Sequence, residues 1–270
     1  MPIVKICFPF KKQYFDKKAV AEGFLLCGVD EVGRGCLAGP VVTAALILKP
    51  ASMRTKSRMP QLADSKILTP EERQKAYDWL IHNSWFATAS IHHRTIDKVN
   101  IYQATLKAMR RAIIQMRLAY PSLQVPAAIV VDAMPLDASF LWETHDASRI
   151  VLKKDHPDAQ KTMEQPWGNV LYFNYGEERS KAIAAASIIA KVTRDRIMHN
   201  LSPSFPAYTF ASHKGYAVPA HKEYVTLCGR SLIHRVSFRS EYDLPDEKTL
   251  QAGIDFTTQE QIVTEEIQPF

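Results

Sequence analysis

Cysteine is scarce in this sequence, and its few copies stand far apart. Four cysteines occur in 270 residues, with no Cys-x-x-Cys pair, at Cys7, Cys27, Cys36 and Cys228. Structural zinc sites use closely spaced cysteine pairs, so the sequence argues against a zinc site. Two of the four lie in or beside apolar stretches, which indicates reduced and mostly buried thiols in a cytoplasmic protein.

Long apolar runs are also missing. No run reaches the roughly 20 residues that cross a bilayer, so the sequence predicts no membrane association. Residues 1–18 contain a brief apolar patch followed closely by lysines, without a long apolar segment or a cleavage site of small residues. We therefore expect no signal peptide and a cytoplasmic location.

Charge is distributed unevenly along the chain. Residues 241–270 hold eight acids and one base, whereas residues 1–240 hold 33 bases and 20 acids, a net charge of +13. A basic body suits a polyanionic partner such as nucleic acid, although many soluble proteins carry such a surplus without one. With 46% hydrophobic residues, the chain is long enough for one globular domain with extensions.

The chain is organised around residues 25–48, where two apolar runs flank a short polar insert. Both runs, 25–29 and 41–48, have the branched and small residues of buried strands. Between them stand two adjacent acids, Asp30 and Glu31, and then the turn Gly33–Arg34–Gly35. An extended strand directs neighbouring side chains to opposite faces, so one acid is costly to bury without a partner. A solvated hairpin turn also accounts for such glycines, but turns seldom need two acids and an arginine.

Apolar periodicity predicts further strands and helices along the chain. Strands are expected at residues 84–91, 127–131 and 170–173, and helices at about 17–24, 96–119 and from 176 onward. Thr69, Pro70 and Glu72 form a helix start, with a capping threonine and an acid three residues later. Residues 49–59 resemble a loop, and residues 137–169 an irregular insertion.

Acids recur at the ends of the apolar segments. Asp132 follows the strand 127–131, as Asp30 follows the first strand, and this repetition favours a shared site. A lone aspartate in that position is otherwise a turn residue or a helix cap. Glu177 and Glu178 open an alanine-rich helix, where the helix dipole alone explains acids.

Two basic loops are candidate nucleic-acid contacts. Ser65 and Lys66 stand just before the helix that begins at Pro70, and a serine and a lysine near a helix N-terminus can hold a phosphate. Lys214 and Tyr216 flank a glycine in a turn, where an aromatic ring can stack on a sugar or base. Simpler explanations are a solvated loop for the first pair and a packed ring for the second.

Several of these stretches, in the same order, resemble type 2 ribonuclease H (ribonuclease HII) over residues 25–238. They are GVDEVGRG at 28–35 with LAGPVV at 37–42, DSK at 64–66, the helix start at 100–109, VDA at 131–133, AAASIIAKVTRD at 184–195, HKGY at 213–216 and His221. The resemblance implies an α/β protein with the ribonuclease H-like fold, a mixed central sheet flanked by helices and followed by a C-terminal helical segment. It divides the chain into an N-terminal extension (1–24), a catalytic domain (25–238, with 137–169 as an insertion) and an acidic tail (239–270).

The resemblance also implies an activity. A ribonuclease HII hydrolyses the RNA strand of RNA–DNA hybrids and cuts 5′ of single ribonucleotides in duplex DNA, leaving 3′-hydroxyl and 5′-phosphate ends. By motif position, the catalytic carboxylates would be Asp30, Glu31, Asp132 and Glu177, the first three as metal ligands. The substrate-binding residues would be Gly33, Arg34, Gly35, Ser65, Lys66, Lys214 and Tyr216. Clustered carboxylates suit Mn²⁺ or Mg²⁺, and we expect two ions and a monomeric enzyme.

Two features depart from the family pattern. The fourth carboxylate of the family is usually aspartate, whereas this chain offers Glu177 or Glu178; counting back from the alanine run selects Glu177. The sibling ribonuclease HIII often has glutamate there, but the intact Gly-Arg-Gly turn favours type 2. The 137–169 insertion is longer than expected. His213 and His221 lie near the site by motif, and neither is assigned as a general base.

Two other classes of protein remain as rivals. One is a catalytically silent nucleic-acid-binding module on the same fold, which the intact acids oppose. The other is a two-metal phosphohydrolase acting on a small phosphate ester, which the basic body opposes.

Overall fold

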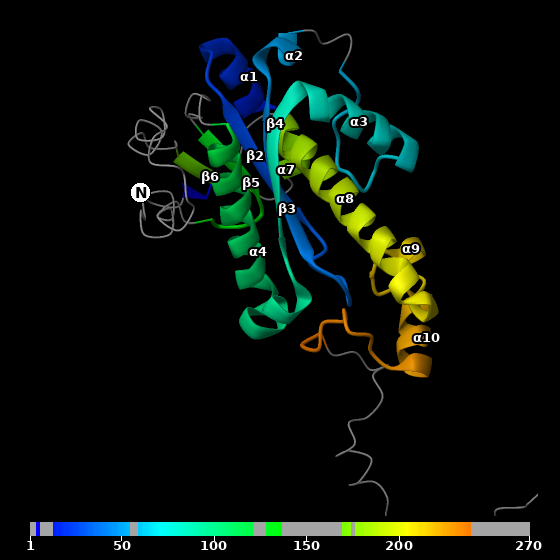
Figure 1. Ribbon diagram of the computed structural model, residues 1–270. Coiled ribbons are helices and arrows are strands. Elements are labelled where there is room, and N and C mark those ends of the chain that lie inside the picture. Colours follow the sequence, from blue (N-terminus) through cyan, green and yellow to red (C-terminus); the bar gives the residue numbers. More distant parts are fainter. Residues whose placement is uncertain are drawn as a thin grey trace, which may run out of the picture.

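The protein is built on a six-stranded mixed sheet with the strand order β1-β6-β5-β2-β3-β4 (Figure 1). The structure, a computed structural model, describes residues 4–5, 13–54, 59–120, 128–136, 169–173 and 176–238. The strands are β1 (Val4–Lys5), β2 (Leu26–Val32), β3 (Val41–Leu48), β4 (Ser84–Ile91), β5 (Ala128–Asp132) and β6 (Asn169–Phe173). Cys7, the acidic tail and the predicted insertion, apart from Asn169, lie outside the described residues.

Strand pairing confirms the strands predicted around the acids. β2 runs antiparallel to β3, which runs antiparallel to β4, whereas β2, β5 and β6 are parallel neighbours. All eight residues of β3 are buried, as the uninterrupted apolar run predicts for a strand covered on both faces. β2 continues through the two acids to Val32, which pairs with Val42, so the strand does not end at the acids.

Helices cover both faces of the sheet. α4 (His93–Ala119) lies on one face, and α8 (Lys181–Leu201) with α3 (Pro70–Asn83) lies on the other (Figure 1). The predicted apolar stripe of α4 is confirmed, because Leu106, Met109, Ile113 and Met116 are buried in one core cluster with residues of the sheet. In the described ranges, every helix falls short of the length or apolar character that a membrane span requires.

The contact between α8 and β2 is unusually close. A Cβ atom built on Gly28 would lie 2.1 Å from the carbonyl carbon of Ala182 and 2.5 Å from the backbone nitrogen of Ile183. The helix backbone therefore rests directly on the strand backbone. This contact fixes α8 two residues away from Asp30, on the same face of β2.

The helix starts follow local capping, with some shifts from the prediction. Both bonds of the predicted capping box are present at the start of α3, between Thr69 and Glu72. α4 begins at His93, three residues earlier than predicted, and Asn100 (φ 65°) interrupts its helical geometry. Asn100 Oδ1 accepts a 3.0 Å bond from Gln103 N–H and so caps the second part of the helix.

Other segments differ from the sequence-based expectation. Residues 49–59 contain a short helix, α2 (Pro50–Arg54), instead of a loop alone. The helix predicted at about 17–24 is present as α1 (Tyr14–Glu22), whereas the edge strand β1 was not predicted. The helix expected from residue 176 is two helices, α7 (Gly176–Arg179) and α8, because Ser180 between them is extended. The C-terminal helical segment is confirmed as η3 (Ser202–Ser204), η4 (Pro206–Tyr208), α9 (Phe210–His213) and α10 (Pro219–Cys228).

Candidate active site

Asp30 and Asp132 occupy equivalent places on neighbouring parallel strands. Val29 of β2 pairs with Val131 of β5, and each aspartate is the next residue along its strand. Because side chains alternate along a strand, both aspartates are directed to the face that α8 covers. Asp30 is 5% exposed and Asp132 is half-buried. The sheet therefore brings these two predicted ligands side by side.

Glu31 is mostly buried, and one of its carboxylate oxygens has no hydrogen-bond partner among the described residues. Arg34 Nη1 lies 3.3 Å from Glu31 Oε1, whereas Glu31 Oε2 is buried and has no hydrogen-bond partner among the described residues. Burial raises the pKa of Glu31, and the cations of Arg34 and Lys66 oppose that shift. A buried carboxylate oxygen without a partner is costly, and a hard divalent cation satisfies it.

The helix α7 closes the site over Asp132. Gly176 N–H donates a 2.7 Å hydrogen bond to Asp132 Oδ1. A Cβ atom at Gly176 would lie 2.9 Å from that oxygen and 2.7 Å from Ile183 Cδ1, so a larger residue there would displace both side chains. Glu177 is the next residue, but its side chain lies outside the described residues, and Glu178 is exposed.

The described side chains do not by themselves supply enough closely spaced ligands for a metal ion. Among these residues, no group of three or more histidine, cysteine, aspartate or glutamate side chains is gathered closely enough to hold an ion. The donors fit a divalent cation in kind, since carboxylate oxygens are hard ligands and Glu31 Oε2 is unsatisfied.

Two fully buried arginines anchor the Gly33–Arg34–Gly35 turn. Arg235 donates to the carbonyl oxygens of Gly33 (2.6 Å), Arg34 (2.8 Å) and Gly39 (3.0 Å). Burial lowers the pKa of Arg235 to about 10, which still leaves it charged at neutral pH. Its guanidinium therefore fixes the backbone of the turn with charge-assisted bonds.

Arg194 of α8 anchors the other side of the same loop. It donates to the carbonyl oxygens of Pro40 (2.9 Å), Ala38 (3.0 Å) and Lys214 (2.8 Å). Gly33 has φ +93°, and a Cβ atom there would lie 2.2 Å from Arg194 Nε. Among the ion pairs of the described residues, none involves Arg194 or Arg235. Both guanidinium groups therefore donate their hydrogen bonds to backbone carbonyl oxygens of loops.

Sequence reasoning missed both anchoring arginines. A signal for Arg194 was present, because it stands four residues after Ala190 and four before Met198, both fully buried. A charged residue in the middle of a helix's buried face needs several internal acceptors. For Arg235, which follows the helices in an irregular segment, periodicity offers no such signal.

Tyr216 lies beside the Gly33–Arg34–Gly35 turn. Its backbone forms an antiparallel bridge with Cys36, the residue after Gly35. The ring lies 5.1 Å from Lys191 Nζ and 5.6 Å from the Arg194 guanidinium carbon. Burial raises the pKa of Tyr216 to about 12, so the hydroxyl stays protonated.

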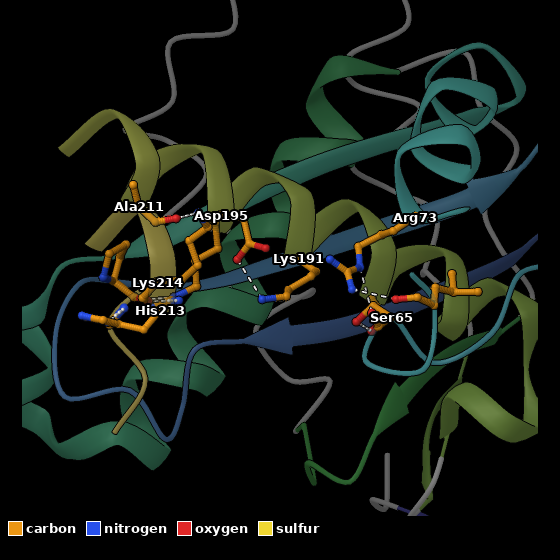
Figure 2. A network of polar contacts seen from close by, with 12 residues as sticks. Ser65, Arg73, Lys191, Asp195, Ala211, His213 and Lys214 are labelled. Carbon is orange, nitrogen blue, oxygen red and sulfur yellow. Dashed lines mark hydrogen bonds and ion pairs between the residues drawn. The ribbon is translucent and has the colours of Figure 1, made fainter. Parts of the chain in front are cut away.

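The other predicted substrate contacts border α8. Figure 2 shows Lys191 and Asp195, joined by a 2.8 Å ion pair, between the Ser65 loop and the Lys214 turn. Ser65 is 3% exposed, and its hydroxyl lies 2.9 Å from the Ser187 hydroxyl, so it ties the loop to α8. Lys66 is exposed.

Comparison with known proteins gives one consistent answer. The family model described as Ribonuclease HII matches residues 27–241. Ribonuclease HII of Rhizobium meliloti (strain 1021) is 35% identical over 239 residues, 88% of this chain and 94% of that protein. The Geobacter sulfurreducens protein of the same name is 38% identical over 228 residues, 83% of this chain and 87% of that protein.

Solved structures agree on the fold. The ribonuclease H2 of Pyrococcus horikoshii OT3 aligns with a TM-score of 0.54 and 26% identity, over 78% of this chain and 92% of that chain. Bst-RNase HIII in complex with Mn²⁺ aligns with a TM-score of 0.56 and 18% identity, over 82% of this chain and 69% of that chain, which shows the fold alone. On the sequence matches, this chain belongs to the ribonuclease HII family, endonucleases that cleave the RNA of RNA–DNA hybrids with divalent metal ions.

Proposed function

We propose that this enzyme also cuts 5′ of a single ribonucleotide embedded in duplex DNA, leaving 3′-hydroxyl and 5′-phosphate ends. The observation that carries the proposal is the Gly33–Arg34–Gly35 turn, which follows the acids. Its carbonyl oxygens accept from buried Arg235, and the loop that continues from it accepts from buried Arg194 at Pro40. Telling RNA from DNA requires a contact with the 2′-hydroxyl. A rigid backbone turn with an uncovered glycine can make that contact.

The acids would hold two divalent ions, Mg²⁺ or Mn²⁺, which would activate the attacking water and stabilise the leaving 3′-oxygen. In this proposal Asp30, Glu31 and Asp132 hold the ions, with Glu177 as a fourth carboxylate. Arg34, 3.3 Å from Glu31, favours the ionised form of that carboxyl and opposes the rise in pKa that burial causes. Gly176 N–H orients Asp132 by donating to its Oδ1. No protein nucleophile is needed.

The substrate contacts are proposed from exposure and position. The Tyr216 ring, half-buried beside Cys36, would stack on the deoxyribose that follows the ribonucleotide. Lys66 and Lys214 would hold phosphates without sequence preference. Ser65 would act through its loop, because its hydroxyl contacts Ser187. The cytoplasmic location and monomeric state remain part of the proposal.

A panel of labelled duplexes tests the proposed specificity. Cleavage rates would be measured on a duplex with one ribonucleotide, a uniform RNA–DNA hybrid, an all-DNA duplex and a small phosphate ester. We expect cleavage of the first two only. Cleavage of the hybrid but not of the single ribonucleotide would refute the junction activity. Binding without cleavage would support the silent module, and turnover of the ester would support the phosphohydrolase.

Gly35 offers a sharp test of the turn. Nothing lies within 4 Å of a Cβ atom built there, so Gly35→Ala should leave the fold stable. The added methyl group would occupy the space proposed for the ribose, and we expect cleavage at a single ribonucleotide to fall about tenfold, the worth of one buried hydrogen bond. The urea unfolding midpoint and the cleavage rate would both be measured. Unchanged cleavage would place the ribose elsewhere.

The fourth carboxylate is tested by two neighbouring variants. Glu177 directly follows Gly176, whose N–H binds Asp132, whereas Glu178 is exposed. Successive helical residues point about 100° apart, so both are not expected to reach one ion. Glu177→Gln should lower turnover and raise the Mn²⁺ concentration required, and Glu178→Gln should change neither by more than about twofold, as for a helix-dipole effect. If Glu178→Gln is the inactive variant, the assignment shifts by one residue.

A further inference from the structure

Three imidazoles, two of them buried and one half-buried, lie under the turn that carries Tyr216, and the mechanism above uses none of them. His213, His221 and His234 surround the ring of Phe210, with ring centroids 5.7, 5.5 and 5.7 Å from it. His221 is 0% exposed and His234 is 2% exposed. No substrate contact is proposed for these histidines, so the two buried imidazoles call for another role.

The turn at residues 214–216 is held by hydrogen bonds from residues outside it. Lys214 (φ 53°) and Gly215 (φ 81°) both adopt the left-handed region, which is unfavourable for lysine. The three carbonyl oxygens of the turn accept, in chain order, from Arg194 Nη1 at 2.8 Å, Leu37 N–H at 2.9 Å and His221 Nδ1 at 2.8 Å. Gly215 N–H donates to His213 Nδ1 at 3.1 Å. The position of Tyr216 is thus imposed by its surroundings.

The donors and acceptors determine where each imidazole carries its proton. The Tyr216 carbonyl can only accept, so His221 Nδ1 is protonated, and Val218 N–H shares the same oxygen at 2.9 Å. Ser231 N–H can only donate, so His234 Nδ1, 2.8 Å away, is the acceptor; the Ser231 hydroxyl also lies 2.7 Å from it. His234 Nε2–H therefore donates to His221 Nε2 at 3.0 Å.

This chain of bonds works only with neutral imidazoles. Protonating His221 Nε2 would set two N–H groups against each other across 3.0 Å. Burial lowers the pKa of His221 to about 4, which agrees with the neutral form. The pair thus forms a relay of hydrogen bonds that all donate in the same direction, from Ser231 N–H through His234 and His221 to the Tyr216 carbonyl.

We propose that His221, oriented by His234, is a positioning residue that fixes the Tyr216 ring for recognition of the RNA–DNA junction. This inference rests on the proposed role of Tyr216. His221 acts only through the Tyr216 peptide, so its loss should change junction selectivity more than hybrid cleavage. The measured quantity is the selectivity ratio, the rate at a single embedded ribonucleotide divided by the rate within a uniform hybrid.

Two substitutions at His221 separate positioning from general structural support. His221→Asn keeps a donor near the Nδ1 position and so keeps the bond to Tyr216, whereas His221→Gln keeps an acceptor near Nε2 for His234 and loses that bond. Each variant loses one hydrogen bond, so their urea midpoints should be similar. We expect an unchanged selectivity ratio for asparagine and about a fivefold lower ratio for glutamine, as for one lost hydrogen bond.

Tyr216→Ala and the double variant complete the test as a double-mutant cycle. If His221 acts through Tyr216, adding His221→Gln to Tyr216→Ala changes the selectivity ratio no further. A continued fall in the double variant, or equal losses for asparagine and glutamine, would overturn the positioning role. If Tyr216→Ala lowers the ratio and His221→Gln does not, only the relay is wrong. If Tyr216→Ala leaves the ratio unchanged, the proposed role of Tyr216 fails, and the inference fails with it.

His234→Asn provides a second route should the His221 variants fold poorly. It keeps an acceptor for Ser231 N–H but removes the Nε2–H that fixes the His221 tautomer. The His221 proton can then move to Nε2 and the bond to Tyr216 is lost, whereas an asparagine amide at position 221 always keeps its N–H donor. The selectivity ratio should fall in the same direction as for His221→Gln. An unchanged ratio in a stable His234→Asn protein would contradict the relay.

Discussion

Replacing Asp132 with asparagine is expected to abolish cleavage of both a hybrid and a single-ribonucleotide duplex. Asparagine has nearly the same shape, and its Oδ1 can still accept from Gly176 N–H, so the fold should be preserved. What is lost is a charged oxygen, the proposed metal ligand, beside Asp30. Even partners outside the ligand shell of a metal are worth about 10–100-fold, so we expect turnover to fall by more than about 100-fold.

Binding separates this effect from a general loss of structure. Affinity for the hybrid, measured in Ca²⁺ to suppress cleavage, should stay within about threefold, because phosphate contacts of the basic residues supply most of it. Asp78→Asn is the matched control, since Asp78 is an exposed acid of α3 that accepts a hydrogen bond from Gln74. Near-normal turnover of Asp132→Asn in Mg²⁺ would remove Asp132 from the metal ligands.

Among glycine-to-alanine substitutions in the described part of the protein, we expect Gly28→Ala to lower the stability most. Its Cβ atom would lie 2.1 and 2.2 Å from the carbonyl carbon and oxygen of Ala182, and backbone atoms of a helix cannot move aside alone. The whole of α8 must shift away from β2, and overpacking of this kind costs about 3 kcal/mol or more. We expect failure to fold or a large drop in the urea midpoint.

Gly35→Ala is the control for the same substitution. It adds the same methyl group in the neighbouring loop, where nothing lies within 4 Å, and should shift stability by less than about 0.5 kcal/mol. Equal midpoints for Gly28→Ala and Gly35→Ala would mean that α8 does not rest on β2 as described.

The strands and helices that shape the site were predictable because their signals are local. β4 has the predicted bounds 84–91, and the capping box at Thr69 formed as its spacing indicates. Elements whose bounds depend on pairing with other strands differ from the prediction. β2 extends past its acids because β3 continues to pair with it, and β1 exists as a strand because β6 supplies an edge.

The candidate site was predictable in part for the same reason. The acids stand at the ends of apolar runs, so the sequence predicted that Asp30 and Asp132 share a site. The parallel pairing of β2 with β5 shows how the sheet brings the two residues side by side. The anchoring of the Gly33 turn by Arg194 and Arg235 was not predictable. Those bonds join residues more than 150 positions apart, and no periodicity encodes them.

Cleavage of a duplex that contains one ribonucleotide, with end mapping and controlled metal, tests the central claim most directly. The ribonucleotide strand would be labelled and incubated with the enzyme in Mg²⁺, in Mn²⁺ or in EDTA. We expect a single cut 5′ of the ribonucleotide, with a 3′-hydroxyl and a 5′-phosphate, in one or both metals. We expect no cleavage in EDTA. Cleavage that persists in EDTA, or a cut on the 3′ side of the ribonucleotide, would contradict it.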